Sequence, residues 1–381
     1  MQPTTGSRDD RPVRRRRGRT AARVCAGVVT LILAGAVAVP ATAADPRPAG
    51  HGVGAVLQRL VDAEQATAAL VRTRDGRHRD AAAFGTADLE TGRPARAHGH
   101  FRVGSVTKTF VATVVLQLAD EGRLGLDDPI ERHLPGVVPG GEDISVRQLL
   151  NHTSGLYNYT EAMDATYDNM LRPYTPQELL GFAFEHDPYF PPGEGWHYSN
   201  TNYAVAGLLI EELTGTPYGE QVERRILRPL GLRHTSVPGD DMTLPRPHAR
   251  GYEPAPDGGG LRDVTELHPS GAWAAGEMVS TTADLERFLD ALMEGRLTSD
   301  ESLAEMRETV ATGVPGNAYG LGVASSDLSC GGEVWGHSGG IFGFVTDASR
   351  ADDGRQLTLS VNPLPGLEPS TVTELYDAFY C

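Results

Sequence analysis

The chain has 381 residues, of which 40% are hydrophobic and 22% are charged. These values are typical of a globular protein with a large core and exclude a largely disordered chain. The formal net charge is −16, from 34 basic and 50 acidic residues. Because phosphate binding requires a basic surface, this balance argues against nucleic acid as a partner.

Residues 1–43 have the pattern of a secretory signal peptide. The segment 11–23 holds seven arginines, an apolar run follows over 24–39, and the small residues Ala41-Thr42-Ala43 end the segment. A membrane anchor is the alternative, but the run is shorter than the roughly 20 residues of a spanning helix. We expect cleavage after Ala43, by an export route that the arginines leave open. Cleavage removes eight arginines and two aspartates and leaves 26 basic and 48 acidic residues, a net charge of −22, in a secreted protein without a membrane span.

Cysteine usage agrees with export. Cys25 lies in the signal segment, so that Cys330 and Cys381 remain in the mature chain. In an oxidising compartment we expect a disulfide between these two residues that ties the C-terminus to the rest of the fold. Two free thiols are the alternative.

Strands are predicted near both ends of the mature chain, and helices between them. Hydrophobic periodicity and capping residues predict helices over 51–62, 109–119, 145–151, 175–187, 202–213, 218–227 and 371–380, and strands over 67–73, 80–85, 341–348 and 356–361. The simplest architecture pairs the first and last strands in one antiparallel sheet, and the helical middle forms a second lobe.

The basic residues comprise 33 arginines and one lysine, Lys108. Arginine stays protonated in proteins, whereas a buried lysine can lose its proton, so a single retained lysine suggests a need for a titratable amine. Lys108 lies three residues after Ser105, just before an apolar helical pattern, which places both side chains on one helix face. A neutral amine there can take the serine proton, and the helix N-terminus stabilises negative charge. The alternative is a capping serine beside a solvated lysine.

Two further motifs carry candidate chemistry. In Tyr198-Ser199-Asn200, a tyrosine near a lysine can shuttle protons, because a cationic neighbour lowers the pKa of a phenol, and the asparagine can hold a substrate amide. In His337-Ser338-Gly339-Gly340, predicted as a loop before a strand that starts at Ile341, small residues allow a substrate backbone to lie against a sheet edge, and the histidine supplies hydrogen bonds or positive charge. Read separately, the motifs also fit a buried tyrosine with a capping asparagine and an ordinary glycine-rich turn.

Two other kinds of site are disfavoured. Residues 336–340 match Gly-x-Ser-x-Gly, but no histidine follows His337 to complete the triad of a nucleophile elbow. His98 and His100 lack a clear third ligand, and the sequence has no His-Glu-x-x-His motif. We therefore expect neither a metal nor an organic cofactor.

In this order, Ser-x-x-Lys, Tyr-x-Asn and His-x-Gly resemble the active-site signature of the serine β-lactamase and penicillin-recognising family. The resemblance runs from about residue 52 to the C-terminus and is closest to secreted D-alanyl-D-alanine carboxypeptidases, with class C β-lactamases and related esterases nearby. Supporting segments are 101–104, 149–156, 274–276, 280–281 and the paired Cys330 and Cys381. The resemblance implies an α+β, β-lactamase/transpeptidase-like fold in residues 44–381. An antiparallel sheet flanked by helices, about 51–104 and 275–381, would meet a mainly helical lobe, about 105–274, at the site.

The same resemblance implies a role for each residue of the motifs. Ser105 would be the acylated nucleophile, Lys108 its proton acceptor or electrostatic partner, and Tyr198 the general acid and base. Asn200 would contact the substrate amide, His337 stands where many relatives have lysine, Ser338 and Gly339 would line the bound substrate, and the N–H groups of Ser105 and Gly340 would form the oxyanion hole. β-Lactams would acylate the same serine.

Two departures affect the expected specificity. Ala324 occupies the position where resembling carboxypeptidases place an arginine for the substrate carboxylate, and Gly340 replaces a hydroxyl residue. We expect a monomeric serine hydrolase, a D-alanyl-D-alanine carboxypeptidase or peptidase acting on peptidoglycan peptides. The alternatives are a β-lactamase, an esterase, an endopeptidase or a D-amino-acid amidase on the same scaffold. A remote alternative is a non-catalytic penicillin sensor or binding protein.

Overall fold

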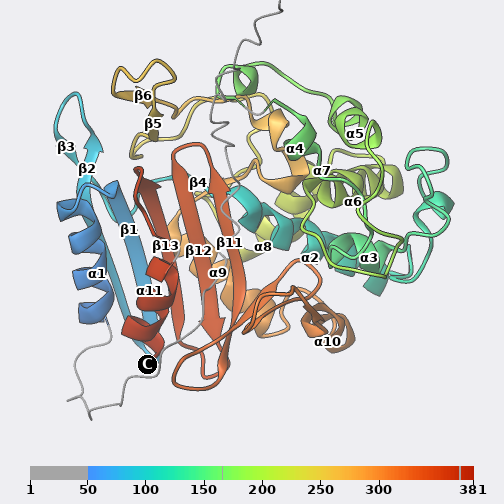
Figure 1. Ribbon diagram of the computed structural model, residues 1–381. Helices are drawn as coiled ribbons and strands as arrows, with labels where there is room; N and C mark the ends of the chain where they lie inside the picture. The colour runs from blue at the N-terminus through green and yellow to red at the C-terminus, as the bar shows by residue number, and fades with distance from the viewer. Residues whose placement is uncertain (1–49, 165, 369) are drawn as a thin grey trace, which may run out of the picture.

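The computed structural model describes residues 50–381 other than 165 and 369, so the predicted signal peptide lies outside the described residues. Within this part of the chain, nine strands form one antiparallel sheet in the order β3-β2-β1-β13-β12-β11-β10-β9-β8 (Figure 1). Their bounds are β1 Ala66–Asp75, β2 His78–Asp88, β3 Arg93–Pro94, β8 Val310–Ala311, β9 Asn317–Tyr319, β10 Ala324–Asp327, β11 Glu333–Ile341, β12 Phe344–Ala351 and β13 Gln356–Pro363. Strand β1 pairs with β13, which confirms the predicted union of the first and last strands.

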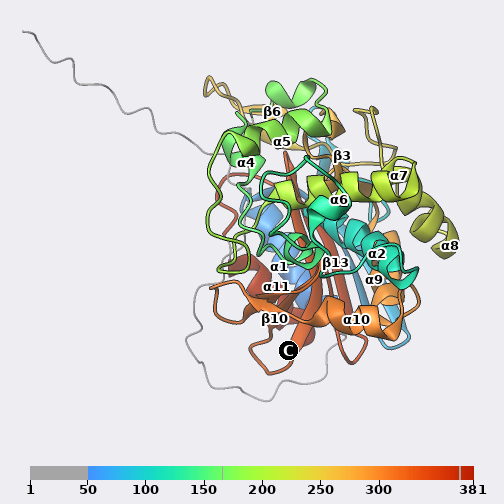
Figure 2. The same cartoon turned by 90° about the vertical axis from the view of Figure 1, so that its right-hand side faces the viewer.

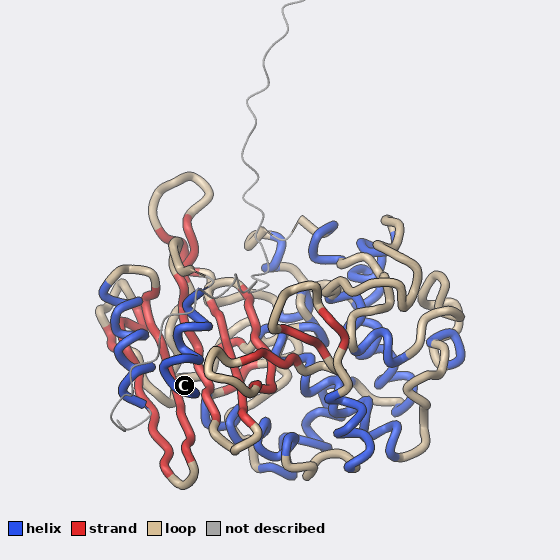
Figure 3. The backbone as a smooth tube through the Cα atoms, turned by 60° about the horizontal axis from the view of Figure 1, so that its bottom comes forward, coloured by secondary structure: helices blue, strands red, loops and turns tan. Residues whose placement is uncertain are grey.

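Helices cover both faces of the sheet and form the second lobe. Their bounds are α1 Gly50–Asp62, α2 Thr107–Asp120, α3 Val146–Leu150, α4 Tyr159–Ala162, α5 Pro176–Phe184, α6 Asn200–Thr214, α7 Tyr218–Val222, α8 Arg228–Leu230, α9 Thr282–Met293, α10 Asp300–Arg307 and α11 Ser370–Tyr380. Helices α1 and α11 lie on one face and α9 on the other, while α2 and α6 belong to the helical lobe that Figure 2 turns toward the viewer. Figure 3 shows the strands together on one side of this lobe. Two short antiparallel pairs complete the strands. One joins β4 Phe101–Arg102 to β7 Val279–Ser280, far along the chain, and the other is the hairpin of β5 Tyr252–Pro254 with β6 Leu261–Asp263.

Local sequence features explain why helix α2 is buried and where helices α3 and α5 begin. Helix α2 is apolar around most of its circumference and is buried at the centre, where Phe110 stacks on Phe288 of α9. Helices α3 and α5 both begin with a capping box, in which Ser145 or Thr175 exchanges hydrogen bonds with the third residue of the helix. Within the described residues, none of the helices has the length and apolar character of a membrane-spanning segment.

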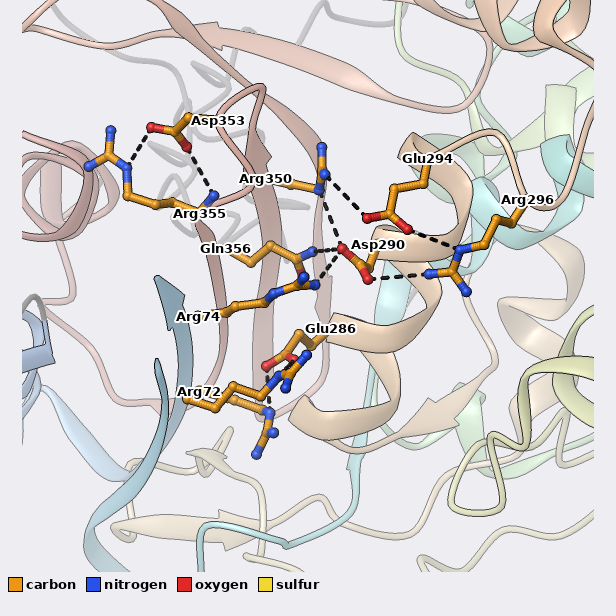
Figure 4. Close-up of polar contacts among 11 residues, drawn as sticks. Arg72, Arg74, Glu286, Asp290, Glu294, Arg296, Arg350, Asp353, Arg355 and Gln356 are labelled. Atoms are coloured by element: carbon orange, nitrogen blue, oxygen red, sulfur yellow. Dashed lines mark hydrogen bonds and ion pairs between the residues drawn. The ribbon is translucent and has the colours of Figure 1, made fainter. Parts of the chain in front are cut away.

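Ion pairs join α9 to the sheet. Glu286 binds Arg72 of β1 at 2.6 Å, and Asp290 binds Arg74 at 2.5 Å (Figure 4). Arg350 of β12 lies 3.7 Å from the same oxygen of Asp290. The side chains of these three arginines are only 13–24% exposed, so they lie largely buried beside the carboxylates of one helix face.

The region around the third motif differs from the prediction. The segment 337–340 is not a loop before a strand, because it lies inside β11, and Ile341 is the last residue of β11 rather than the first of the next strand. Glycines suggested a turn, but here they allow the strand backbone to contact another segment closely. The predicted disulfide between Cys330 and Cys381 is confirmed, and it connects the β10–β11 turn with the end of α11.

Candidate active site

Ser105 lies on a 3₁₀ turn, Gly104–Val106, directly before α2. The backbone of β11 lies against this turn. A Cβ atom at Gly339 would lie 2.0 Å from the carbonyl oxygen of Val103 and 2.8 Å from the amide nitrogen of Ser105. Gly104 has a φ of +52°, and a Cβ atom there would lie 2.8 Å from the amide nitrogen of Gly340. Both glycines are therefore required for the nucleophile to contact the strand.

The geometry of the β11–β12 hairpin orients the Gly340 amide. Ile341 pairs with Phe344 around a two-residue turn, and Gly340 lies opposite Val345. Because hydrogen-bonded and non-hydrogen-bonded pairs alternate in an antiparallel ladder, the Gly340 N–H points away from β12 and toward the Ser105 turn. The two amides of the predicted oxyanion hole thus lie together.

Lys108 is fully buried. Its Nζ lies 3.1 Å from Ser105 Oγ, 2.8 Å from Asn200 Oδ1 and 2.7 Å from the carbonyl oxygen of Ala275. Burial lowers the pKa of Lys108 well below its ordinary value, because these neutral partners do not compensate for the loss of hydration. The arrangement favours a neutral amine whose lone pair can accept the serine proton.

Tyr198 lies beside this pair. Its ring centroid is 4.9 Å from Lys108 Nζ, and its buried hydroxyl has no hydrogen-bond partner of good geometry among the described residues. Burial raises the pKa of Tyr198, and the Ser105 hydroxyl opposes that shift only in part. The expectation that a cationic neighbour lowers this pKa is therefore wrong, since desolvation of the phenolate dominates. Tyr198 holds its proton at neutral pH.

Both polar atoms of the Asn200 side-chain amide form hydrogen bonds within the protein. Its Oδ1 accepts a hydrogen bond from Lys108, and its Nδ2 donates one to Thr160 Oγ1 at 3.1 Å. The backbone N–H of Asn200 donates to Asn158 Oδ1 at 3.0 Å. One N–H of the side-chain amide remains for a substrate carbonyl.

His337 is buried and neutral. Its Nδ1 is hydrogen-bonded to the carbonyl oxygen of Ser338, which can only accept, so Nδ1 carries the proton. Its Nε2 then accepts from the Tyr319 hydroxyl at 2.7 Å. Burial, aided by repulsion from Lys108, lowers the pKa of His337 to about 3. Of the two predicted roles, the structure favours hydrogen bonding and not positive charge.

His152 positions the second motif, a role that the motif search missed. Its Nδ1 accepts from the N–H of Ser199 and from Nδ2 of Asn202, each at 3.1 Å. Its ring lies 4.3 Å from that of Tyr198, measured between centroids. His152 thus holds the segment that carries both Tyr198 and Asn200. The signal was present, because His152 belongs to the 149–156 segment of the resemblance.

Two cavities meet at Ser105 and Gly340. One, of about 150 Å³, is lined by Ala324, His337 and Ser338 and is called the Ala324 cavity. The other, of about 240 Å³, is lined by Asn200 and by residues of the β11–β12 turn and is called the Asn200 cavity. A larger hollow of about 920 Å³, beside Tyr218 and Glu277, contains none of the predicted site residues.

A sequence model of the Beta-lactamase family matches residues 55–359, a range that includes all three motifs. The chain belongs to the beta-lactamase family. It is similar to penicillin-binding protein 4* of Bacillus subtilis, with 30% identity over 72% of this chain and 62% of the relative, so it spans about three-fifths of that protein. It is also similar to esterase EstB of Burkholderia gladioli, with 31% identity over 78% of this chain and 86% of the relative.

Among solved structures, a D-stereospecific amidohydrolase from Streptomyces sp. matches with a TM-score of 0.80 and 42% identity, over 87% of this chain and 98% of the other. These relatives confirm the predicted β-lactamase/transpeptidase-like fold and the recognised family. Its family and its hydrolase relatives identify this beta-lactamase family member as a serine hydrolase. The structure brings the eight predicted site residues to one place, whereas their individual roles stay predictions.

Proposed function

We propose that this chain is a secreted hydrolase that cleaves amide bonds of D-amino acid derivatives through an acyl-enzyme on Ser105. The observation that carries the proposal is that, in the described part of the chain, the Ala324 cavity has Asp347 as its one acidic lining residue and offers no cationic side chain to a substrate carboxylate. In the resemblance, Ala324 stands where an arginine holds the carboxylate of the leaving D-alanine, and we assign the acyl group to the other cavity at Ser105, the Asn200 cavity. Among the described residues that line the Ala324 cavity there is neither lysine nor arginine, and His337 is neutral. A leaving group without a free carboxylate therefore fits better than a C-terminal D-alanine.

The chemistry follows from the positions of the polar atoms. Ser105 Oγ attacks the substrate carbonyl carbon while its proton passes to neutral Lys108 Nζ at 3.1 Å. The oxyanion accepts from the N–H groups of Ser105 and Gly340, a device worth roughly 3–4 kcal/mol per donor. The carbon–nitrogen bond then breaks, Tyr198 gives its proton to the departing amine, and Lys108 returns a proton to Tyr198.

Deacylation reverses the direction of proton flow. Water attacks the ester carbonyl, its proton passes to the Tyr198–Lys108 pair, and the ester bond to Ser105 Oγ breaks as the serine regains its proton. The products are a free amine and a carboxylic acid. β-Lactams, which are cyclic amides, would acylate Ser105 by the same first step.

The amide proposal has support from relatives and from the site. The Streptomyces relative is described as a D-stereospecific amidohydrolase, and it matches almost over its full length. The D-alanyl-D-alanine carboxypeptidase activity expected from the resemblance is the second candidate, and the similarity to penicillin-binding protein 4* supports the acylation of Ser105 by penicillins that both candidates share. The two candidates differ in their need for a carboxylate on the leaving group.

The first test uses Ser105→Ala. We expect this variant to lose hydrolysis of D-phenylalanine p-nitroanilide and covalent labelling by a fluorescent penicillin. Ser329→Ala, which changes an exposed serine bonded to Asp377, is the matched control and should keep both. Activity retained by Ser105→Ala contradicts the assignment of the nucleophile.

The second test uses Ala324→Arg and a D-alanyl-D-alanine peptide with a free or an amidated C-terminus. The unmodified protein should hydrolyse the two peptides with kcat/KM values within about threefold of each other. The added guanidinium should favour the free carboxylate by about tenfold or more, because hydrogen bonds between charged groups are worth about 1.5–3 kcal/mol. A strong preference of the unmodified protein for the free carboxylate would select the carboxypeptidase instead.

A further inference from the structure

A carboxylate lines the Asn200 cavity at some distance from the nucleophile. Glu253 lies on β5, and its Oε1 accepts a hydrogen bond from the N–H of Gly343 at 3.3 Å. Gly343 is in the β11–β12 turn, three residues after Gly340. Three residues of chain span at most about 10 Å, so Glu253 is within reach of an acyl group whose carbonyl oxygen is bound by the Gly340 N–H.

The charge of Glu253 is not neutralised by the protein. Arg262 lies directly opposite Glu253 in the β5–β6 pair, but its guanidinium binds Asp168 at 2.6 Å and stacks on the Tyr167 ring at 4.4 Å. Within the described part of the chain, Glu253 has no ion-pair partner within 4.0 Å. Burial raises the pKa of Glu253, and the Gly343 N–H opposes that shift.

The remainder of this cavity is uncharged. Met163, Met170 and Phe342 give it an apolar wall, and Thr160 and Asn200 contribute neutral polar atoms. Among the described residues that line the cavity, Glu253 is the one charged side chain. A half-buried carboxylate without a counter-ion is stabilised by a ligand that brings the missing positive charge. An apolar wall in a cavity that holds both this charge and Ser105 suits the carbon skeleton that connects an amine to the reacting carbonyl.

We infer that Glu253 forms a binding subsite for an ammonium group carried by the acyl part of the substrate. The inference rests on the proposed function, because that function assigns the acyl group to the Asn200 cavity. The ammonium is either the free α-amine of a D-amino acid derivative or a more distant amine, and the experiment distinguishes these two sources. N-acylated substrates without another amine would not use the subsite.

The test compares substrates that differ by one positive charge. Glu253→Gln keeps an oxygen for the Gly343 N–H and removes the charge. The first substrate pair is p-nitrophenyl 6-aminohexanoate and p-nitrophenyl hexanoate, which probe a distant amine without any requirement for an amide bond or a D-centre. The second pair is D-phenylalanine p-nitroanilide and its N-acetyl form, which probe the α-amine. Background hydrolysis is measured with Ser105→Ala.

For one of the two pairs, we expect Glu253→Gln to lower kcat/KM of the amine-bearing substrate about tenfold and that of its neutral partner less than twofold. The pair that responds identifies the source of the ammonium. Asp257→Asn removes a carboxylate from the exposed tip of the β5–β6 hairpin. It should leave the ratio of kcat/KM for the amine-bearing substrate to kcat/KM for its neutral partner unchanged in both pairs. An unchanged melting temperature of Glu253→Gln excludes a folding defect as the cause.

One result would overturn the inference. It is a ratio of kcat/KM for the amine-bearing substrate to kcat/KM for its neutral partner that is the same in Glu253→Gln and in the unmodified protein for both pairs, whether both members lose activity equally or neither does. The proposed function fails separately, if the p-nitroanilides are not cleaved at all. In that case the ester pair alone decides whether the ammonium subsite exists.

Discussion

Two regions of the molecule hold basic side chains away from water, and they do so in opposite ways. On the α9 face, Arg72 and Arg74 each contact a carboxylate at 2.5–2.6 Å (Figure 4). At the active site, Lys108 is completely buried, and its described partners are a hydroxyl, an amide oxygen and a backbone carbonyl. A guanidinium keeps its charge and needs strong acceptors, which are carboxylates on the α9 face and backbone carbonyls around the buried Arg102, whereas an amine can lose its proton instead. This contrast explains why 33 of the 34 basic residues can be arginine while position 108 is lysine.

The strongest test of this difference between the two regions is to exchange the two residue types. Lys108→Arg should lower kcat/KM for D-phenylalanine p-nitroanilide at least about 10³-fold, because arginine cannot accept the Ser105 proton. Arg74→Lys, the reverse exchange on the α9 face, should leave kcat/KM within about twofold. Steady-state kinetics of the two purified variants test both statements.

A folding defect must be separated from a chemical one, since arginine is larger than lysine. Lys108→Met has a similar length and no charge, and it should lose activity to the same extent while its melting temperature stays at or above that of the unmodified protein. Substantial activity in Lys108→Met contradicts the role of the amine as proton acceptor.

The second prediction concerns the other neutral base near the nucleophile. Because burial lowers the pKa of His337 to about 3, the unfolded chain binds a proton at this residue between pH 6.5 and 3 and the folded chain does not. The free energy of unfolding that depends on His337 should therefore fall as pH falls through this interval, by about 1.4 kcal/mol per pH unit. Urea denaturation of the unmodified protein and of His337→Gln at several pH values measures the effect.

The variant supplies the reference for this measurement. The loss of the Tyr319 hydrogen bond shifts the stability of His337→Gln by a constant amount and does not change the slope. The free energy of unfolding of the unmodified protein minus that of His337→Gln should decrease toward acid pH. Parallel pH profiles would mean that the pKa of His337 is the same in the folded and the unfolded chain, which contradicts the prediction.

The smallest effect is expected in the ion-pair region. Asp290→Ala leaves Arg74 and Arg350 without their shared carboxylate and should lower the free energy of unfolding by about 2 kcal/mol, since these groups are only partly exposed. The kcat/KM of this variant should stay within about twofold, because the network does not contact Ser105. Chemical denaturation and steady-state kinetics on the same preparation measure the free energy of unfolding and kcat/KM. A large loss of activity without a loss of stability would refute the separation of the two regions.

Much of the site could be predicted from sequence because its chemistry resides in short motifs. The spacing of Ser105 and Lys108 and the caps at Ser145 and Thr175 depend on neighbours within one helical turn. The strand character of β11 could not be predicted, because its glycines are explained by contact with Val103, far away in the chain. Burial of Tyr198 likewise arises from the tertiary fold, which reversed the direction predicted for its pKa.

Glu253 shows the limit of motif reasoning most clearly. It lies on a three-residue strand beside a stretch rich in proline and glycine, with no recognisable pattern around it. Its relation to the site depends on the β11–β12 turn, 90 residues further along the chain. Such a residue is found only once the cavity it lines is known.

The pairing of β1 with β13 has a consequence for synthesis of the protein. A growing polypeptide carries Ser105, Lys108 and the β1–β2 pair early, but β1 acquires its second neighbour, β13, only when residues from Gln356 onward have been made. Gly340 and the rest of β11 also arrive late, and contacts between such distant segments are slow to form. A ribosome-bound chain therefore has the proposed nucleophile without the strand that supplies Gly340 to the proposed oxyanion hole, and the proposed catalysis requires a chain that is complete at least to the end of β11.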